Sequence, residues 1–234
     1  MSTRRNEVHI LFVGYSRPDS NDSTAMRANC TCTLIKTRNG RNIIVDTLTA
    51  WDGERLTEVL RNLHGLQPED IHVVVCTHGH SDHTGCNYLF RAAQWHIVGA
   101  CVSNRDKYLD CALTRGESEP FQLCGDDVTV VRTPGHTLSC VSVLVRDTAH
   151  EGVVGICGDL FERVEDIADP TIWLEAGSEN ASSQRRQRLR LAELCDYIVP
   201  GHGQGFAVTS QMREKLRQQL NACNSGEHLE DVFM

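Results

Sequence analysis

The feature that most constrains the fold of this chain is a dense group of histidines directly after an apolar run. Residues 77–85 read THGHSDHTG and follow Ile71–Cys76, a near-continuous apolar run typical of a strand buried on both faces. Residues two apart in an extended stretch project to one side, so His78 and His80 can bind one ion together. α/β proteins place ligand sites at such strand ends, and a metal site is therefore expected here.

The same segment supplies two further candidate ligands. Ser81 is positioned to cap a following helix, and the turn would carry Asp82 and His83 to a neighbouring position. Imidazole with carboxylate suits zinc, with iron or manganese as alternatives. The motif predicts the beginning of a metal site, but one loop cannot complete it.

Three more candidates share one context, a polar residue just after an apolar strand and beside glycine. They are His136 in TPGHT, Asp159 in CGDL and His202 in PGHG. Glycine permits tight turns and close backbone approach, so these segments can end at a crowded centre. A lone histidine at a strand end is more often a hydrogen-bonded structural residue. Together with the first motif, however, the candidates make seven ligands, enough for two ions that share a carboxylate.

Length and composition limit the class of protein. The chain has 234 residues, and we expect 1–234 to form a single domain. It has no apolar run of about 18 residues and no secretory signal, so neither a membrane span nor secretion is expected. Its 11 cysteines are odd in number and scattered, which predicts reduced core residues in the cytoplasm (cytosol) and nucleus. Cys30 and Cys32 share a strand face and are expected to pack in the core.

Alternating and near-continuous apolar runs predict the secondary structure. The expected strands are Val8–Tyr15, Thr31–Thr37, Asn42–Asp46, Ile71–Cys76, Trp95–Ala100, Val128–Arg132, Cys140–Arg146, Val153–Cys157 and Tyr197–Val199. The expected helices are Glu54–Leu63, Ser182–Cys195 and Ser210–Cys223, and Ser16–Asn29 is expected to be a polar loop. A hairpin turn falls at Asn39-Gly40. Strands with recurring helices favour an α/β or α+β layered domain.

In the order and spacing of these seven residues, the chain resembles the metallo-β-lactamase fold superfamily. Its pattern is His-x-His-x-Asp-His, then a His, a bridging Asp and a final His, and the order matches from Ile10 to about Val208. The resemblance implies a four-layer αβ/βα sandwich with two metal ions, zinc first, at one edge between the sheets. By position, the first ion would be bound by His78, His80 and His136. The second would be bound by Asp82, His83 and His202, with Asp159 between the two ions.

Segments 77–85, 158–163 and 199–203, with Phe206, look most like single-domain animal members of the superfamily that are assigned to endoribonuclease cleavage of histone pre-mRNA. The family often has Asp-Thr-Gly after an early strand, whereas here Asp46-Thr47 is followed by Leu48. Asp46 would be a buttress near the metals, and Leu48 puts the local geometry of that loop in question. It does not affect the ligand set.

The expected reaction is hydrolysis by a metal-bound hydroxide, with Asp82 as the catalytic residue that orients the nucleophile or shuttles its proton. Two divalent ions, two aspartates and a hydroxide leave the centre with a charge of about +1, which suits RNA or a small anionic substrate. The net charge of −8 argues mildly against non-specific nucleic-acid binding. The alternatives are a glyoxalase II-like thioester (hydroxyacylglutathione) hydrolase, a mononuclear iron persulfide dioxygenase, and a binding protein without turnover.

Several basic and aromatic residues have two interpretations each. Arg185–Arg190 contains four arginines that could pair with phosphates, although a solvated helix face is the simpler interpretation. Arg163 is better placed for phosphate, but it could instead pair with Glu162 or Glu165. Trp173 and Phe206 are expected in the core. The sequence leaves a homodimer open.

Overall fold

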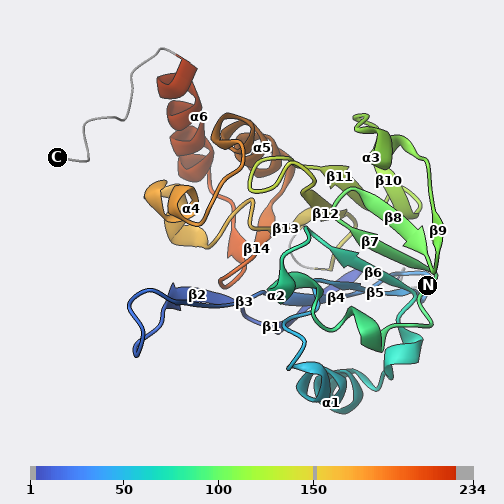
Figure 1. The fold of residues 1–234 in the computed structure, drawn as a ribbon. Helices are drawn as coiled ribbons and strands as arrows, with labels where there is room; N and C mark the ends of the chain where they lie inside the picture. The colour runs from blue at the N-terminus through green and yellow to red at the C-terminus, as the bar shows by residue number, and fades with distance from the viewer. Residues whose placement is uncertain (1–3, 150–151, 225–234) are drawn as a thin grey trace.

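The computed structural model describes residues 4–149 and 152–224, and two facing sheets form its centre (Figure 1). The first sheet takes the order β1-β4-β5-β6-β7-β8-β9, with β5, β6 and β7 parallel. The bounds of its strands are β1 Glu7–Phe12, β4 Cys32–Lys36, β5 Asn42–Val45, β6 Val73–Cys76, β7 Trp95–Val98, β8 Cys101–Asn104 and β9 Lys107–Tyr108.

The second sheet takes the order β10-β11-β12-β13-β14-β15, with β13 and β14 parallel. Its strands are β10 Phe121–Cys124, β11 Val128–Arg132, β12 Val141–Val145, β13 Val154–Gly158, β14 Tyr197–Pro200 and β15 Phe206–Ala207. The helices are α1 Gly53–His64, α2 Ser81–Thr84, α3 Ala112–Arg115, α4 Thr171–Glu175, α5 Ala181–Leu194 and α6 Ser210–Asn224. Short 3-10 turns occupy Pro68–Asp70, Asn87–Leu89 and Val164–Ile167.

Apolar side chains fill three layers, which explains why the strands read as near-continuous apolar runs. Val45 of β5 faces the space between the sheets, whereas its neighbour Ile44 packs with Leu56 of α1 on the outer face. On the other side, Leu144 of β12 packs with Leu191 of α5. The layers are therefore helix, sheet, sheet and helix, and the predicted αβ/βα sandwich is confirmed. That residues 1–234 form a single domain stays a prediction.

The principal predicted elements are present, with shifted ends. Helix α1 ends at Gly65, whose φ of 66° is the left-handed conformation expected of a glycine stop. Trp173 is fully buried and Phe206 is 8% exposed, as expected of core residues. The sequence patterns gave no sign of β8, β9, β10, β15, α3 or α4. None of the helices in the described part of the chain is long and apolar enough to cross a membrane.

One predicted segment is wrong. The chain from Ser16 to Asn29 is not a loop but a hairpin of β2 (Tyr15–Pro18) and β3 (Met26–Asn29), and the first strand ends at Phe12. The hairpin projects from the body as a separate arm (Figure 1). Its residues are mostly exposed, so its sequence lacks the alternation of apolar and polar residues that marks a half-buried strand.

Candidate metal centre

Four chain segments that follow strands meet at one edge of the two sheets. The loop after β6 carries His78 and His80 and leads into α2, which carries Asp82 and His83. The turn between β11 and β12, the end of β13 and the end of β14 bring in the remaining three predicted ligands, His136, Asp159 and His202. All seven residues predicted from the sequence lie together in the structure.

The first group consists of three imidazoles and one carboxylate. His80 Nδ1 lies 2.8 Å from His78 Nε2 and 3.1 Å from His136 Nε2. Asp159 Oδ2 lies 3.5 Å from His78 Nε2 and 3.3 Å from His136 Nε2. These four atoms converge on one point, which is the arrangement that a tetrahedral ion requires.

The second group lies on the other side of Asp159. His83 Nε2 is 3.2 Å from Asp159 Oδ1, and His202 Nε2 is 3.3 Å from Asp159 Oδ2. Asp82 Oδ2 is 3.9 Å from both of these imidazole nitrogens. Asp159 therefore contacts both groups, as the family pattern implies for a residue between two ions.

Residues outside the two groups fix the orientation of the histidines. Asp46 Oδ2 lies 3.0 Å from His83 Nδ1, and Asp46 Oδ1 accepts a hydrogen bond from the Thr77 backbone N–H at 2.7 Å. His202 Nδ1 donates to the backbone carbonyl of Asn29 over 3.1 Å. Because Nδ1 of His83 and Nδ1 of His202 are engaged in this way, Nε2 is left as the coordinating atom of these two histidines.

The buttress loop shows what the departure from Asp-Thr-Gly does. Asp46 has a φ of 57° and Leu48 a φ of 61°, the left-handed region that glycine adopts without strain. Leu48 is nevertheless buried in the core beside α1. The strain of about 1–2 kcal/mol is therefore offset by packing, and Asp46 keeps its contacts with Thr77 and His83.

The residues present fit a divalent cation. Within the described residues, the buried atoms Asp82 Oδ2, His83 Nε2 and Asp159 Oδ1 have no hydrogen-bond partner. A buried polar atom without a partner is costly, and here the unpartnered atoms include carboxylate oxygens and an imidazole nitrogen that point to one region. A cation between them would satisfy all three.

Burial and the mixed charges shift the pKa values at the site in opposite directions. Burial lowers the pKa of His78, and the nearby His83 lowers it further. Burial alone would also lower the pKa of His202, but Asp159 outweighs it and raises the pKa to about 9. Burial, together with Asp159, raises the pKa of Glu162 to about 8.

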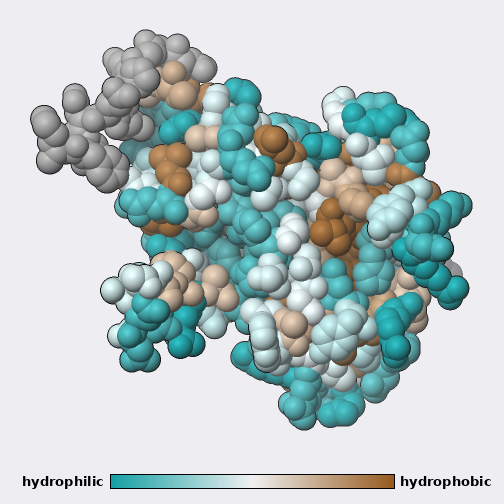
Figure 2. Space-filling view, viewed as in Figure 1, coloured by the Kyte–Doolittle hydropathy of each residue, from teal (hydrophilic) through white to brown (hydrophobic). Residues whose placement is uncertain are grey.

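The two groups lie at the floor of a pocket of about 510 Å³. Hairpin β2–β3 forms one wall of this pocket and the segment around α4 the other, and Figure 2 shows hydrophilic residues between these two parts. The lining residues outside the two groups are Ser16, Arg17, Pro18, Met26, Ala28, Glu162, Arg163, Ile172, Glu175 and Ala176. Glycine is required beside the floor, because a Cβ at Gly201 would overlap Oδ1 of Asp159.

Helix α5 packs behind the floor of the pocket. Its arginines were predicted to form one solvated face, and this prediction is wrong for Arg188. Arg188 is fully buried, and its guanidinium pairs with Asp166 at 2.5 and 3.0 Å and donates to the Leu160 carbonyl. Gln184 donates to the Asp159 carbonyl at 3.0 Å. The chain from Asp159 to Asp166 is therefore held by side chains of α5.

The other arginines of α5 are also engaged. Arg185 lies 5.2 Å from the centre of the Trp173 ring, and Arg186 donates to Ser182. Arg190 donates to the Arg132 carbonyl. None of these three arginines lines the pocket above the metal groups, so phosphate pairing by this cluster near the site is not supported.

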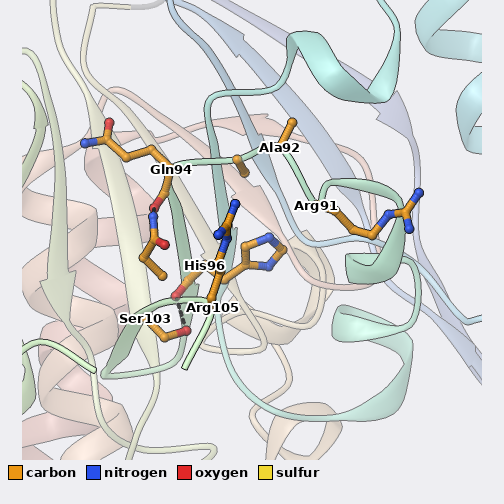
Figure 3. Close-up of a pocket in the computed structure, with 8 residues that line it drawn as sticks. Arg91, Ala92, Gln94, His96, Ser103 and Arg105 are labelled. Carbon is orange, nitrogen blue, oxygen red and sulfur yellow. Dashed lines mark hydrogen bonds between the residues drawn. The ribbon is translucent and has the colours of Figure 1, made fainter. Parts of the chain in front are cut away.

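A second pocket, of about 500 Å³, is drawn in Figure 3. It is lined by residues at the start of β7 and the end of β8, whereas the ligands follow the opposite end of the neighbouring strand β6. His96 directs Nε2 to the Phe90 carbonyl at 3.0 Å, and the Ser103 hydroxyl bonds the His96 carbonyl. Arg91 and Arg105 complete its basic lining, and it holds none of the seven ligands.

Some residues of the site were not predicted. Arg17 belongs to the hairpin that the sequence pattern did not reveal, and Asn29 acts through its backbone carbonyl. Glu162 was expected only as a partner of Arg163, but Arg163 lies 3.9 Å from Glu165 instead. The expected helix cap at Ser81 is wrong, because α2 begins at Ser81 itself and the residue before it occupies the cap position.

Comparison with known proteins agrees with this geometry. The chain matches the family model of the metallo-β-lactamase superfamily over residues 26–202. It is 40% identical over 227 residues to metallo-β-lactamase domain-containing protein 1 of Homo sapiens, covering 86% of this chain and 82% of the human protein. The Xenopus laevis protein of that name is 36% identical over 204 residues, covering 87% and 82%.

Solved structures show the same fold. A Thermotoga maritima protein described as a candidate metallo-β-lactamase superimposes with a TM-score of 0.61 at 24% identity, covering 87% of this chain and 99% of that one. The match of the family model and the identity to the human and Xenopus proteins extend over most of the chain. The chain therefore belongs to the metallo-β-lactamase superfamily.

Proposed function

We propose that this metal-dependent hydrolase uses two divalent ions, with zinc as the first candidate, to cleave RNA phosphodiesters. The observation that carries the proposal is that Arg17 and Arg163 line the same pocket as the ligand groups. Guanidinium groups present paired donors that match phosphate oxygens, so a phosphodiester at the floor would have cationic partners on the pocket lining.

The position of these arginines suits an extended anionic chain. Arg17 lies on the exposed hairpin, with its guanidinium 5.2 Å from the centre of the Tyr15 ring. Tyr15 is 43% exposed, so an aromatic face stands beside the cation. Tyr15 does not line the pocket itself, but exposed aromatic rings beside arginines are elements that hold single-stranded nucleic acid. Arg163 would contact the phosphate group nearer to the floor.

The protein residues divide the chemistry among them. When bound, the two ions would supply a hydroxide nucleophile near neutral pH and offset the negative charge that develops on the phosphoryl oxygens. His78, His80, His136, Asp82, His83, His202 and Asp159 would hold them. Asp82 is 16% exposed at its side chain and lines the pocket, so it can orient the attacking water and accept its proton.

A second candidate function is hydrolysis of a small acyl substrate such as a thioester. Pro18, Met26 and Ile172 give the pocket apolar contacts that an acyl chain could use. The two candidates differ in the role of Arg17 and Arg163. Both guanidinium groups would pair with phosphates of a bound RNA, whereas a neutral acyl group has no charge for them to pair with.

The test is a metal analysis followed by parallel assays on a single-stranded RNA and a panel of thioesters. The variant Arg17→Gln with Arg163→Gln should lower RNA cleavage and leave metal content unchanged. RNA cleavage that persists in His78→Ala with His80→Ala would indicate a contaminating nuclease. Turnover of thioesters without RNA cleavage would overturn the proposal in favour of the acyl substrate. One iron per chain, with oxygen uptake on glutathione persulfide, would indicate a mononuclear oxygenase.

A further inference from the structure

Glu162 lies beside the second ligand group, and the chemistry described above assigns it no role. It follows Asp159 by three residues in a tight turn, in which Leu160 N–H donates to Cys157 and Phe161 N–H to Gly158. The backbone N–H of Glu162 donates to Asp166 Oδ2 at 2.7 Å. Glu162 is therefore held by the same buried support as the floor of the pocket.

The carboxylate of Glu162 is buried and incompletely paired. Its side chain is 3% exposed, and its Oε1 has no hydrogen-bond partner within residues 4–149 and 152–224. In that part of the chain, His202 is the only basic residue within ion-pair distance, with 3.9 Å between Oε2 and Nε2. The neighbouring Arg163 approaches Glu165 and does not pair with Glu162.

His202 links Glu162 to the second group. Its Nδ1 is engaged by the Asn29 carbonyl, so Nε2 is its one coordinating nitrogen. Two sets of potential ligands share that atom, one with Asp82 and His83 and the other with Asp159 and Glu162. Because His202 Nε2 binds one ion at a time, the two sets are alternative positions for the second ion, and among the described residues Glu162 shares its set with Asp159 and His202 and not with Asp82 and His83.

The distances allow Glu162 and His202 to share an ion. Glu162 Oε2 and Asp82 Oδ2 are each 3.9 Å from His202 Nε2. Ligand atoms about 2.1 Å from one ion lie at most about 4.2 Å apart, so each of these carboxylates is within the range for binding an ion together with His202.

We propose that Glu162 is a further ligand of the second ion. This rests on the two-ion centre of the proposed function. In the position beside Glu162, the second ion has two carboxylates and one imidazole, from Asp159, Glu162 and His202, whereas the first has three imidazoles and shares only Asp159. Carboxylate oxygen suits manganese better than imidazole nitrogen does, so Glu162 favours Mn²⁺ at the second position more than it favours Zn²⁺.

The test is titration of Mn²⁺ into the full chain carrying one equivalent of Zn²⁺, with free Mn²⁺ followed by electron paramagnetic resonance. The wild type should bind one Mn²⁺. In Glu162→Gln, the dissociation constant for Mn²⁺ should rise at least about tenfold, and the first zinc should be retained. The dissociation constant for Zn²⁺ at the second position should rise by a smaller factor. Glu165→Gln is the matched control, since it removes the same charge from an exposed side chain of the same segment and should change neither constant.

Each result separates this inference from the function on which it rests. A Glu162→Gln chain that binds the second ion as tightly as the wild type would overturn the role of Glu162 and leave the two-ion centre intact. A wild type that binds no second ion of either metal would overturn the centre itself. If Glu162→Gln does not fold, a crystal structure of the wild type loaded with Zn²⁺ and Mn²⁺ decides through anomalous scattering. Glu162 outside bonding distance of the second ion would then contradict the proposal.

Discussion

The floor and the walls of the pocket are built in opposite ways. The floor residues are buried and held by neighbours. Asp46 holds His83, and the Asn29 carbonyl holds His202. The Arg188–Asp166 pair holds the chain that follows Asp159. The hairpin wall is exposed, with Met26 62% accessible to solvent. Among the residues that the structure describes, its strands pair only with each other.

This difference separates chemistry from substrate choice. Atoms that bind an ion must be placed accurately, and the buried floor provides that through neighbours on both sheets and α5. Exposed wall residues such as Arg17 and Met26 can change without disturbing the floor, because the hairpin supports the floor through the backbone carbonyl of Asn29. Substitutions in the floor should therefore remove metal or stability, whereas substitutions of exposed wall residues should change substrate binding alone.

The largest effect is expected from His78→Ala with His80→Ala. The double variant removes two of the three imidazoles of the first group, so it should lose the first ion and at least about a thousandfold of turnover. Metal analysis and an assay on the same preparation measure both quantities. Full activity in a metal-free double variant would show that the floor is not the catalytic centre.

Arg188→Met should destabilise the chain by about 3–5 kcal/mol, because it leaves Asp166 as an uncompensated buried charge. Arg188→Met with Asp166→Leu should recover much of that loss. Urea unfolding measures the free energies. Arg186→Gln on the exposed face of the same helix is the control, with a change below about 0.5 kcal/mol. Equal losses in the control and in Arg188→Met would contradict the assignment of Arg188 as a support of the floor.

Asp46→Asn should weaken metal binding about 10–100-fold while the ligands themselves remain. The reason is that Asp46 orients His83 and holds the Thr77 backbone. Competition with a chromophoric chelator gives the dissociation constants. An unchanged affinity would mean that the floor does not depend on this buttress.

The smallest effect is expected in the wall. Arg17→Gln should raise KM for an anionic substrate about three- to tenfold and leave kcat and metal content nearly unchanged, because the side chain lines the pocket without contacting the ligand groups. Steady-state kinetics and metal analysis on one preparation separate these quantities. A loss of metal in this variant would show that wall and floor are coupled.

The floor could be predicted from the sequence because its signals are local. Each ligand stands just after an apolar strand and beside glycine or in the histidine-rich segment, and the parallel strands bring these ends to one edge. The ligands could be identified from their residue types, histidine and aspartate. The αβ/βα sandwich could be predicted from near-continuous apolar segments, which are typical of strands buried on both faces. Asp46 was recognisable because the family places a buttress there.

The walls and the support behind the floor could not be predicted in the same way. The β2–β3 hairpin is exposed, so burial left no pattern in its residues. Arg188 looked like part of a solvated arginine face, because its partner Asp166 is 22 residues away and neither residue alone signals burial. Glu162 lies close to the ligands only after the turn that follows Asp159 is formed.

We propose that one buried floor holds two divalent ions that share Asp159. The decisive measurement is the metal content of the reconstituted chain, compared with that of Asp159→Ala. Two ions per chain are expected in the wild type, and the variant should lose at least one, since Asp159 contacts both groups. A wild type that saturates at one ion or none, or an Asp159→Ala chain that retains two ions with unchanged affinity, would contradict it.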